Sequence, residues 1–313
     1  MNRTSIEWVR NPDGSQGYTH NPMSGCRNHT PEGLCLGGLF PCYAYKLANG
    51  RLKPLYLANT NIARPNTTWF RGSHAEQRAL LDPFYPRFWE ERLSAPYSVM
   101  RVTNQGGVYY EQKPKGIFVC DMGELFGDWI PSHWQANIFQ AITDNSQHRF
   151  YLLTKQPQNL VKFSPFPDNC WVGVTATNAD MVIRAGYCLT QIQARIKFLS
   201  LEPLLEWQHG KPGFIATMFQ NWGINWLIIG ACTGTEAEMT ELARKYTLTE
   251  MPYANKWTAQ PNPDSVREIV EAADKAGIPV FLKDNLLDLV NYQSPETDFA
   301  FNKEGCYRQE MPK

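Results

Sequence analysis

The strongest constraint on the fold is an alternation that begins at Gly116. Short apolar runs rich in Val, Ile, Leu and Phe alternate with polar or amphipathic stretches that are long enough for helices. Repeated strand–helix units with continuous apolar strands are typical of a parallel sheet whose outer face is covered. With one or two further strands near the N-terminus, the strand count approaches that of a barrel. The sequence therefore predicts an α/β fold, a complete or partial TIM-like (β/α) barrel.

The alternation also predicts the individual elements. Strands are expected at residues 17–20, 117–120, 150–153, 171–174, 196–199, 226–229 and 280–282. Helices are expected at residues 43–48, 132–145, 158–163, 179–193, 236–246 and 265–276.

The stretch between the first helix and Gly116 is irregular. Prolines interrupt residues 49–115, residues 103–107 are turn-like, and only residues 86–93 have a helical pattern. We expect one domain over residues 1–313, in which residues 49–115 form an irregular insertion, either a lid over the barrel mouth or a plain surface excursion.

Polar or reactive side chains follow each apolar run from Gly116 onward. They are Asp121 and Glu124, Thr154 and Lys155, Thr175 and Asn178, Ser200 and Glu202, Cys232 and Thr233, and Lys283 and Asp284. In a parallel barrel these positions share the C-terminal face, where active sites lie. A polar strand end is by itself explained by the solvent exposure of loops, so only the whole set indicates a site.

Three cysteines, Cys26, Cys35 and Cys42, stand in a glycine-rich loop that leads into the first predicted helix. Eight residues separate the first two cysteines and six separate the last two. Glycines allow a backbone to fold tightly around a bound group. Three thiolates without a nearby fourth leave one coordination position open, as a catalytic metal requires. The loop is therefore interpreted as a metal or cluster site.

The spacing of the cysteines does not choose between an iron–sulfur cluster and zinc. In the zinc interpretation His29 completes the ligand set. The interpretation without a metal is three free cysteines, or one disulfide and a spare thiol. Cys120 and Cys232 lie at predicted strand ends, where they could meet a second cluster, a substrate or one another. Both are assigned to structure by default, because buried cysteine behaves as a small apolar residue.

Several segments, in the same order along the chain, resemble a phage and prokaryotic three-cysteine-motif family of unknown function that is related to radical S-adenosylmethionine (SAM) enzymes. They are residues 21–26, 42–44, 118–126, 153–157, 171–175, 198–205 and 226–230. The chain departs from that family in its last cysteine gap, which is six residues here instead of two. Gly37 and Gly38 lie in this gap and allow the loop to fold back.

The resemblance implies that Cys26, Cys35 and Cys42 bind a [4Fe-4S] cluster, whose fourth iron chelates the amino and carboxyl groups of SAM. One-electron cleavage of SAM to a 5′-deoxyadenosyl radical would then abstract hydrogen from a macromolecular substrate, a nucleobase or a peptide. The electron would come from a donor such as a ferredoxin or flavodoxin.

The same resemblance implies roles for further residues in binding SAM. The turn with Asp121, Met122 and Glu124 would hold the amino group, and Lys155 would hold the carboxylate. Ser200 or Glu202 would bind the ribose hydroxyls. Weaker candidates for the SAM site are Thr175 and Asn178. Tyr43 would either pack on adenine or belong to the core as an aromatic residue.

Composition limits the other possibilities. Lys plus Arg equals Asp plus Glu, at 30 each, so nucleic-acid binding would need a local patch. Eight cysteines are too few for a disulfide scaffold and favour a reducing compartment. The N-terminal residues lack an apolar signal core, and no run of eighteen apolar residues occurs. We expect a cytoplasmic protein with no membrane association.

Three functional classes follow from these observations. The favoured hypothesis is a radical SAM enzyme. The second is a zinc-dependent hydrolase built on a barrel. The third is a nucleic-acid-binding or partner-binding protein with a structural metal.

Overall fold

A computed structural model describes residues 1–65, 67–97, 99–102, 108–111, 113–208, 210–286, 295–302 and 304–312. The chain divides into two compact units. The first unit comprises Met1–His29, Cys42–Leu153 and Phe166–Trp171, and the second comprises Thr30–Pro41, Thr154–Pro165 and Val172–Lys313. The expectation of one domain with a lid stays a prediction. The expected turn at residues 103–107 lies outside the described residues.

The largest sheet has eight strands in the order β1-β2-β9-β10-β11-β12-β13-β17. Their bounds are β1 Asn2–Arg3, β2 Tyr18–His20, β9 Gly116–Val119, β10 Arg149–Thr154, β11 Cys170–Thr175, β12 Ile196–Leu201, β13 Trp226–Ile229 and β17 Val280–Leu282. The pairs β2–β9, β9–β10, β12–β13 and β13–β17 are parallel, whereas β1–β2 is antiparallel. The α/β class is confirmed. In the part of the chain that the structure describes, β1 and β17 end the strand order, so no closed barrel is found.

The first unit packs its apolar strands around Trp8, which is fully buried. The Trp8 ring lies 5.1 Å from the ring of Phe118 and 5.7 Å from that of Tyr151, measured between centroids. The other elements of this unit are β3 Met23–Ser24, α1 Tyr43–Asn49, α2 Lys53–Ala58, η1 Thr68–Phe70, α3 His74–Leu81, β6 Arg87–Phe88, η2 Glu90–Arg92, β7 Val99–Val102, β8 Val108–Glu111 and α4 Ser132–Asp144. The sequence predicted α1 and α4 but not α2 and α3.

The helix expected at residues 86–93 is wrong. That stretch contains strand β6 and the 3-10 turn η2, and β6 pairs with β3 in antiparallel register. The Arg87 guanidinium is fully buried and donates hydrogen bonds of 2.7 to 3.0 Å to four backbone carbonyls. The carbonyls belong to Asn59, Leu80, Asp82 and Tyr85. The pairing with β3 and the bond to Asn59, both between residues distant in sequence, hold the backbone extended at a place where the local pattern favours a helix.

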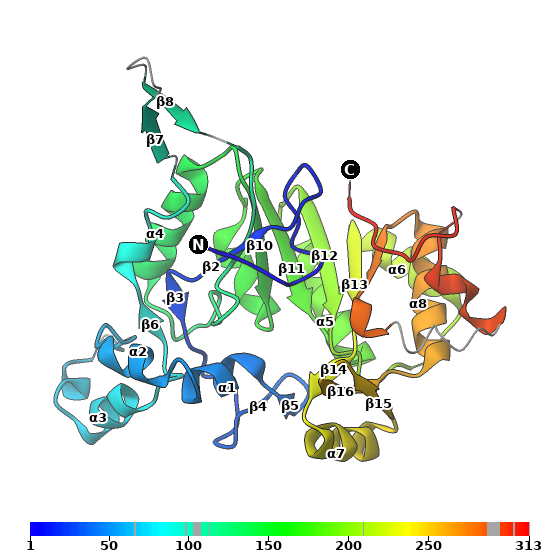
Figure 1. Ribbon diagram of the computed structural model, residues 1–313, viewed down its shortest axis with the longest axis horizontal. Helices are drawn as coiled ribbons and strands as arrows, with labels where there is room; N and C mark the ends of the chain where they lie inside the picture. The colour runs from blue at the N-terminus through cyan, green and yellow to red at the C-terminus, as the bar shows by residue number, and fades with distance from the viewer. Residues whose placement is uncertain are drawn as a thin grey trace. The chain divides into compact units, whose positions relative to one another are not determined.

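The second unit contains α5 Ala179–Thr190, α6 Pro212–Asn221, α7 Glu236–Tyr246, α8 Pro263–Ala276 and the 3-10 helix η3 Pro157–Phe163. A three-stranded antiparallel sheet is formed by β14 Cys232–Gly234, β16 Lys256–Gln260 and β15 Thr249–Tyr253, and α7 packs against it (Figure 1). The predicted bounds of α7 are confirmed, because Thr235 and Glu238 form a capping box at its first turn. The sequence missed α6 and the three-stranded sheet, and η3 is 3-10 rather than α-helical.

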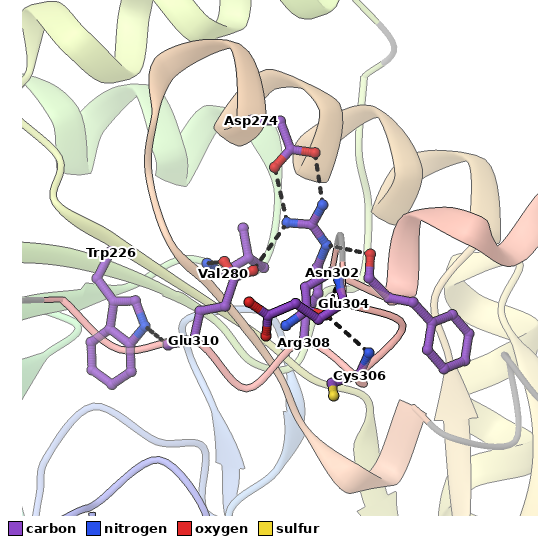
Figure 2. Close-up of polar contacts among 9 residues, drawn as sticks. Trp226, Asp274, Val280, Asn302, Glu304, Cys306, Arg308 and Glu310 are labelled. Carbon is purple, nitrogen blue, oxygen red and sulfur yellow. Dashed lines mark hydrogen bonds and ion pairs between the residues drawn. The ribbon is translucent and has the colours of Figure 1, made fainter.

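The C-terminal segment lies along the edge of β17 (Figure 2). Leu282 donates its backbone N–H to the Arg308 carbonyl at 2.7 Å, and Glu310 donates to the Val280 carbonyl at 3.1 Å. Arg308 also forms two hydrogen bonds, of 2.9 and 2.8 Å, to the Asp274 carboxylate on α8. This antiparallel extension covers backbone groups that an exposed edge strand would leave unpaired.

Glycine at position 186 makes room for a tryptophan between two helices of the second unit. A Cβ atom there would lie 2.1 Å from the Trp222 ring, whereas a Cβ at Gly213 on α6 would meet nothing within 4 Å. We expect Gly186→Ala to lower the free energy of unfolding by about 1–3 kcal/mol, despite the better helix propensity of alanine. Gly213→Ala should be neutral or stabilising by up to about 1 kcal/mol. Urea unfolding of both variants tests this, and equal midpoints would contradict it.

Candidate functional site

The three loop cysteines are divided between the two units. Cys26 and Cys42 belong to the first unit and Cys35 to the second, and none of the three forms a disulfide. The candidate residues are therefore described unit by unit.

The start of the cysteine loop is fixed by a backbone pairing between Gly25 and the turn that follows β9. The Gly25 N–H donates to the Met122 carbonyl at 2.8 Å, and the Glu124 N–H donates to the Gly25 carbonyl at 3.2 Å. Gly25 has φ +91°, and a Cβ atom there would lie 2.6 Å from the Tyr85 carbonyl oxygen. Only glycine fits this position, so the loop is held directly against the acidic turn.

Cys26 and Cys42 pack on one apolar cluster beneath the loop. Its buried members are Ala44, Ala48, Tyr56, Phe84, Trp89 and Met122. The Cys26 N–H donates to the Phe84 carbonyl at 3.0 Å, and the Cys26 sulfur accepts the N–H of Asn28 at 3.2 Å. Such a hydrogen bond from a backbone N–H stabilises negative charge on sulfur, and bonds of this kind tune the reduction potential of iron–sulfur clusters.

The acidic turn is organised by Asn21, which the sequence analysis did not select. The side-chain N–H of Asn21 donates to the Asp121 carboxylate at 2.6 Å, and the side-chain oxygen of Asn21 accepts the Met122 N–H at 3.0 Å. Burial raises the pKa of Asp121 to about 6. Asn21 directly follows strand β2, and Asp121 lies two residues after strand β9. A search for polar residues at the end of the first predicted strand would therefore have found Asn21.

The other predicted residues of this turn have structural contacts. The Glu124 carboxylate is buried and accepts the Phe126 N–H at 3.2 Å. The Met122 side chain belongs to the apolar cluster under the loop. Tyr43 is half exposed, and its hydroxyl donates to the Asp121 carbonyl. The proposed role of Tyr43 on adenine stays a prediction.

In the second unit the loop around Cys35 is held by side chains from three places. Thr177 donates its hydroxyl to the Gly37 carbonyl at 3.0 Å, and Tyr246 donates to the Gly38 carbonyl at 2.7 Å. Lys155 lies beside the same loop, with its Cδ 3.2 Å from a Cβ built on Gly37. Lys155 therefore lies beside the loop segment that contains Cys35. The resemblance implies that Lys155 binds the carboxylate of SAM.

Parallel register brings three strand ends together in the second unit. Leu201, Ile229 and Leu282 are aligned across β12, β13 and β17. Two of the residues that follow, Glu202 and Lys283, form an ion pair of 3.3 Å. Asn285, which the sequence analysis did not select, exchanges hydrogen bonds of 3.2 and 2.8 Å with the backbone of Ala231 at the same edge.

The remaining predicted residues also belong to the second unit. The Ser200 hydroxyl is fully buried and has no hydrogen-bond partner among the described residues. Thr175 is buried at the end of β11. Asn178 caps α5 by accepting the Met181 N–H at 2.9 Å, and it lines a cleft of about 350 Å³. The unsatisfied Ser200 hydroxyl is the clearest unexplained polar atom among the predicted residues.

In the part of the chain that the structure describes, no group of three or more His, Cys, Asp or Glu side chains could hold a single metal ion. The His29 ring packs 5.0 Å from the Tyr45 ring and 5.3 Å from the Phe84 ring, between centroids. Cys120 is buried, which raises the pKa of its thiol, and Cys232 packs in an apolar cluster with Leu205 and Met239. These contacts agree with the structural roles expected for both cysteines.

Replacing Gly25 should disrupt the loop for a steric reason. Gly25→Ala adds a Cβ atom against backbone and forces alanine to a positive φ, so we expect a loss of about 2–5 kcal/mol in the free energy of unfolding. Gly14 has φ +80° but open space around it, so Gly14→Ala should cost only about 1–2 kcal/mol. Urea titration compares the two variants. A Gly25→Ala variant no less stable than Gly14→Ala would show that the loop tolerates a side chain there.

The raised pKa of Asp121 makes a prediction about pH. Below pH 3.8 the carboxyl is protonated in both folded and unfolded chains, and stability is lost as the pH rises through about 6, because burial opposes ionisation in the folded state. Asp121→Asn should therefore raise the free energy of unfolding by about 1–3 kcal/mol at pH 8 and leave it unchanged or lower near pH 4. Thermal unfolding at both pH values measures this. Asp128→Asn is the control, because Asp128 is exposed. If Asp121→Asn changed the unfolding temperature by the same amount at both pH values, the prediction would be refuted.

None of the helices in the described part of the chain combines the length and the apolar run that crossing a bilayer requires.

Comparison with known proteins gives one family and three distant structures. No curated protein matches the chain. Spore photoproduct lyase with a cysteine-to-serine mutation is 10% identical, with 90% of this chain and 80% of that chain covered and a TM-score of 0.46. Spore photoproduct lyase complexed with dinucleoside spore photoproduct is also 10% identical, with 83% and 75% covered and a TM-score of 0.44. A double mutant of that lyase with bound AdoMet and the dinucleoside is 9% identical, with 84% and 75% covered and a TM-score of 0.41.

At these identities and TM-scores, the similarity supports no conclusion about fold or reaction. The resemblance to the three-cysteine-motif phage family likewise stays a prediction. The family model described as "Protein of unknown function (DUF5131)", in contrast, matches residues 3–251, which is most of the chain. The chain therefore belongs to this DUF5131 family.

Proposed function

We propose that this protein is a radical SAM-type enzyme in which Cys26, Cys35 and Cys42 bind a [4Fe-4S] cluster. The observation that carries the proposal is the backbone pairing of Gly25 with the turn at Met122 and Glu124. It holds the first cysteine of the loop beside the acidic turn, and the resemblance to radical SAM enzymes implies that this turn binds the amino group of SAM. The proposed fold for this chemistry is a partial (β/α) barrel.

The donor chemistry of the loop fits such a cluster. None of the three cysteines forms a disulfide, and the Cys26 sulfur accepts a backbone N–H. Each cysteine of a cluster binds a different iron, so its sulfurs need not converge on one point as the ligands of a single zinc ion must. The zinc-dependent hydrolase is the alternative, and metal analysis of the purified protein distinguishes the two. No observation favours a purely structural metal.

The protein's own groups would bind and orient SAM. Asn21 holds the Asp121 carboxylate in place, so that Asp121 can accept hydrogen bonds from a cationic amino group, which would also favour its ionised form. Lys155, beside the Cys35 loop, would attract the carboxylate. The unsatisfied Ser200 hydroxyl and the Glu202 carboxylate would receive the ribose hydroxyls, and Thr175, Asn178 and Tyr43 would line the rest of the site.

Bound in this way, the cluster would supply one electron, delivered by a ferredoxin or flavodoxin, for cleavage of SAM to the 5′-deoxyadenosyl radical that abstracts hydrogen from a nucleobase or peptide. The residues around it would exclude water from the radical, and a cytoplasmic location is proposed because cysteines without disulfides are typical of a reducing compartment.

Anaerobic purification followed by iron and sulfide analysis tests the proposal. We expect about four irons per chain, and an electron paramagnetic resonance signal of the reduced protein that shifts when SAM is added. Cys26→Ala, Cys35→Ala and Cys42→Ala should each abolish the signal, because each removes the ligand of one iron. Cys306→Ala is the control, because Cys306 is exposed and outside the loop.

Stoichiometric zinc without iron would contradict the cluster and favour the zinc-dependent hydrolase. An iron signal that does not respond to SAM would overturn the SAM-binding part of the proposal. A signal that survives each of the three loop substitutions would show that other residues bind the cluster.

A further inference from the structure

The insertion of the first unit carries an uneven share of the charge. Between α1 and η2, residues 50–89 contain six Arg and Lys residues and two carboxylates, although the chain as a whole has a net charge of zero. Four of the basic side chains are exposed: Arg51, Lys53, Arg71 and Arg78. The segment is therefore a local basic region, the kind of feature that a neutral chain needs in order to bind a polyanion.

One large aromatic side chain projects from this basic region. Trp69 is 70% exposed, whereas the next residue, Phe70, is buried. Phe70 packs with Ile62 and with Ala79 on α3, so the two aromatic rings of η1 have opposite environments. A tryptophan this exposed leaves most of its apolar surface in water, and it is explained if the ring stacks on a ligand.

The loop that presents Trp69 is held in place by Glu76. The Glu76 carboxylate accepts a hydrogen bond from the Arg64 side chain at 2.7 Å and another from the Gly72 N–H at 2.5 Å. Ser73 caps α3 through the Glu76 N–H and donates its hydroxyl to the Phe70 carbonyl at 2.6 Å. The Glu76 carboxylate is thus engaged inside the loop, and the nearby charge of Arg71 adds to the bonds from Arg64 and Gly72 in lowering its pKa. The surface is preorganised, which lowers the entropic cost of binding.

Helix α3 follows η1 along the chain, with Arg71, Gly72 and Ser73 between them. His74, Gln77, Arg78 and Leu81 are exposed there, whereas Ala79 faces the small core around Phe70. The apolar face of α3 is thus turned inward and its outward face is mainly polar. That is the reverse of a helix that lies on a membrane, whose apolar face must be free to enter the lipid.

We propose that the Trp69 surface, formed by Trp69, Arg71, His74, Arg78 and Leu81, binds single-stranded nucleic acid. An unpaired base stacks on the Trp69 ring, and the guanidinium groups of Arg71 and Arg78 bind the phosphates on either side. A single strand is required because the bases of a duplex are already stacked on one another. The binding surface itself does not depend on the cluster. The inference that this surface selects a nucleobase over a peptide as the substrate of the enzyme rests on the proposed function.

Fluorescence anisotropy with a labelled oligothymidylate about 20 nucleotides long, without SAM, tests the proposal. Trp69→Ala should raise the dissociation constant at least about five-fold, since one stacked base is lost. Arg71→Gln combined with Arg78→Gln should reduce the slope of log affinity against log salt by about 1.4, for two phosphates. The matched controls in the second unit are Phe214→Ala, at a side chain that is 67% exposed, and Arg184→Gln. Neither control should change binding.

Three outcomes would overturn the proposal. The first is no saturable binding by the unsubstituted protein, and the second is unchanged binding by a folded Trp69→Ala variant. The third is binding to phosphatidylserine–phosphatidylcholine vesicles that is tighter than to oligothymidylate and is lost in Trp69→Ala, which would make this a membrane surface. A Cys26→Ala variant that loses the paramagnetic signal but keeps oligothymidylate binding would separate this surface from the proposed cluster.

Discussion

The first unit depends on the close approach of two backbone segments at Gly25 and Gly123. A Cβ atom at either position would lie about 3 Å or less from the backbone of a neighbouring segment, and Gly25 also has a positive φ. The approach allows two hydrogen bonds to form between the cysteine loop and the turn after β9. The placement of Cys26, the support of the acidic turn by Asn21, and the packing of both first-unit cysteines on one apolar cluster all follow from this contact.

Polar groups buried within the insertion give it a defined shape without long helices. Arg87 has no exposed surface and satisfies four carbonyls, so its charge is spread over backbone dipoles instead of a carboxylate partner. Glu76 has a similar role near the tip, where it ties Arg64 to Gly72. Arg51, Lys53, Arg71 and Arg78 remain exposed on the outside of the insertion.

The second unit shows how parallel strands gather functional groups. Because β12, β13 and β17 are in register, residues far apart in the sequence follow aligned strand ends, and Glu202 meets Lys283 there. The C-terminal segment stabilises strand β17 by pairing with it along its length, and Arg308 in this segment bonds to Asp274. The buried Ser200 hydroxyl, which has no partner among the described residues, is the point at which this edge has an unmet hydrogen bond.

The sequence by itself determined the elements whose signals are local. Apolar runs specified β13 and β17 to the residue, and the predicted helix at residues 236–246 matches α7, whose first turn is closed by a local capping box, because these signals need only neighbouring residues. It also identified the cysteine loop and most of the polar strand ends. Only the tertiary structure decided that β6 is a strand, that Asn21 supports Asp121, and that Cys35 belongs to a different unit from Cys26 and Cys42. Each of these depends on hydrogen bonds or packing between residues distant in sequence, and such contacts override local propensity.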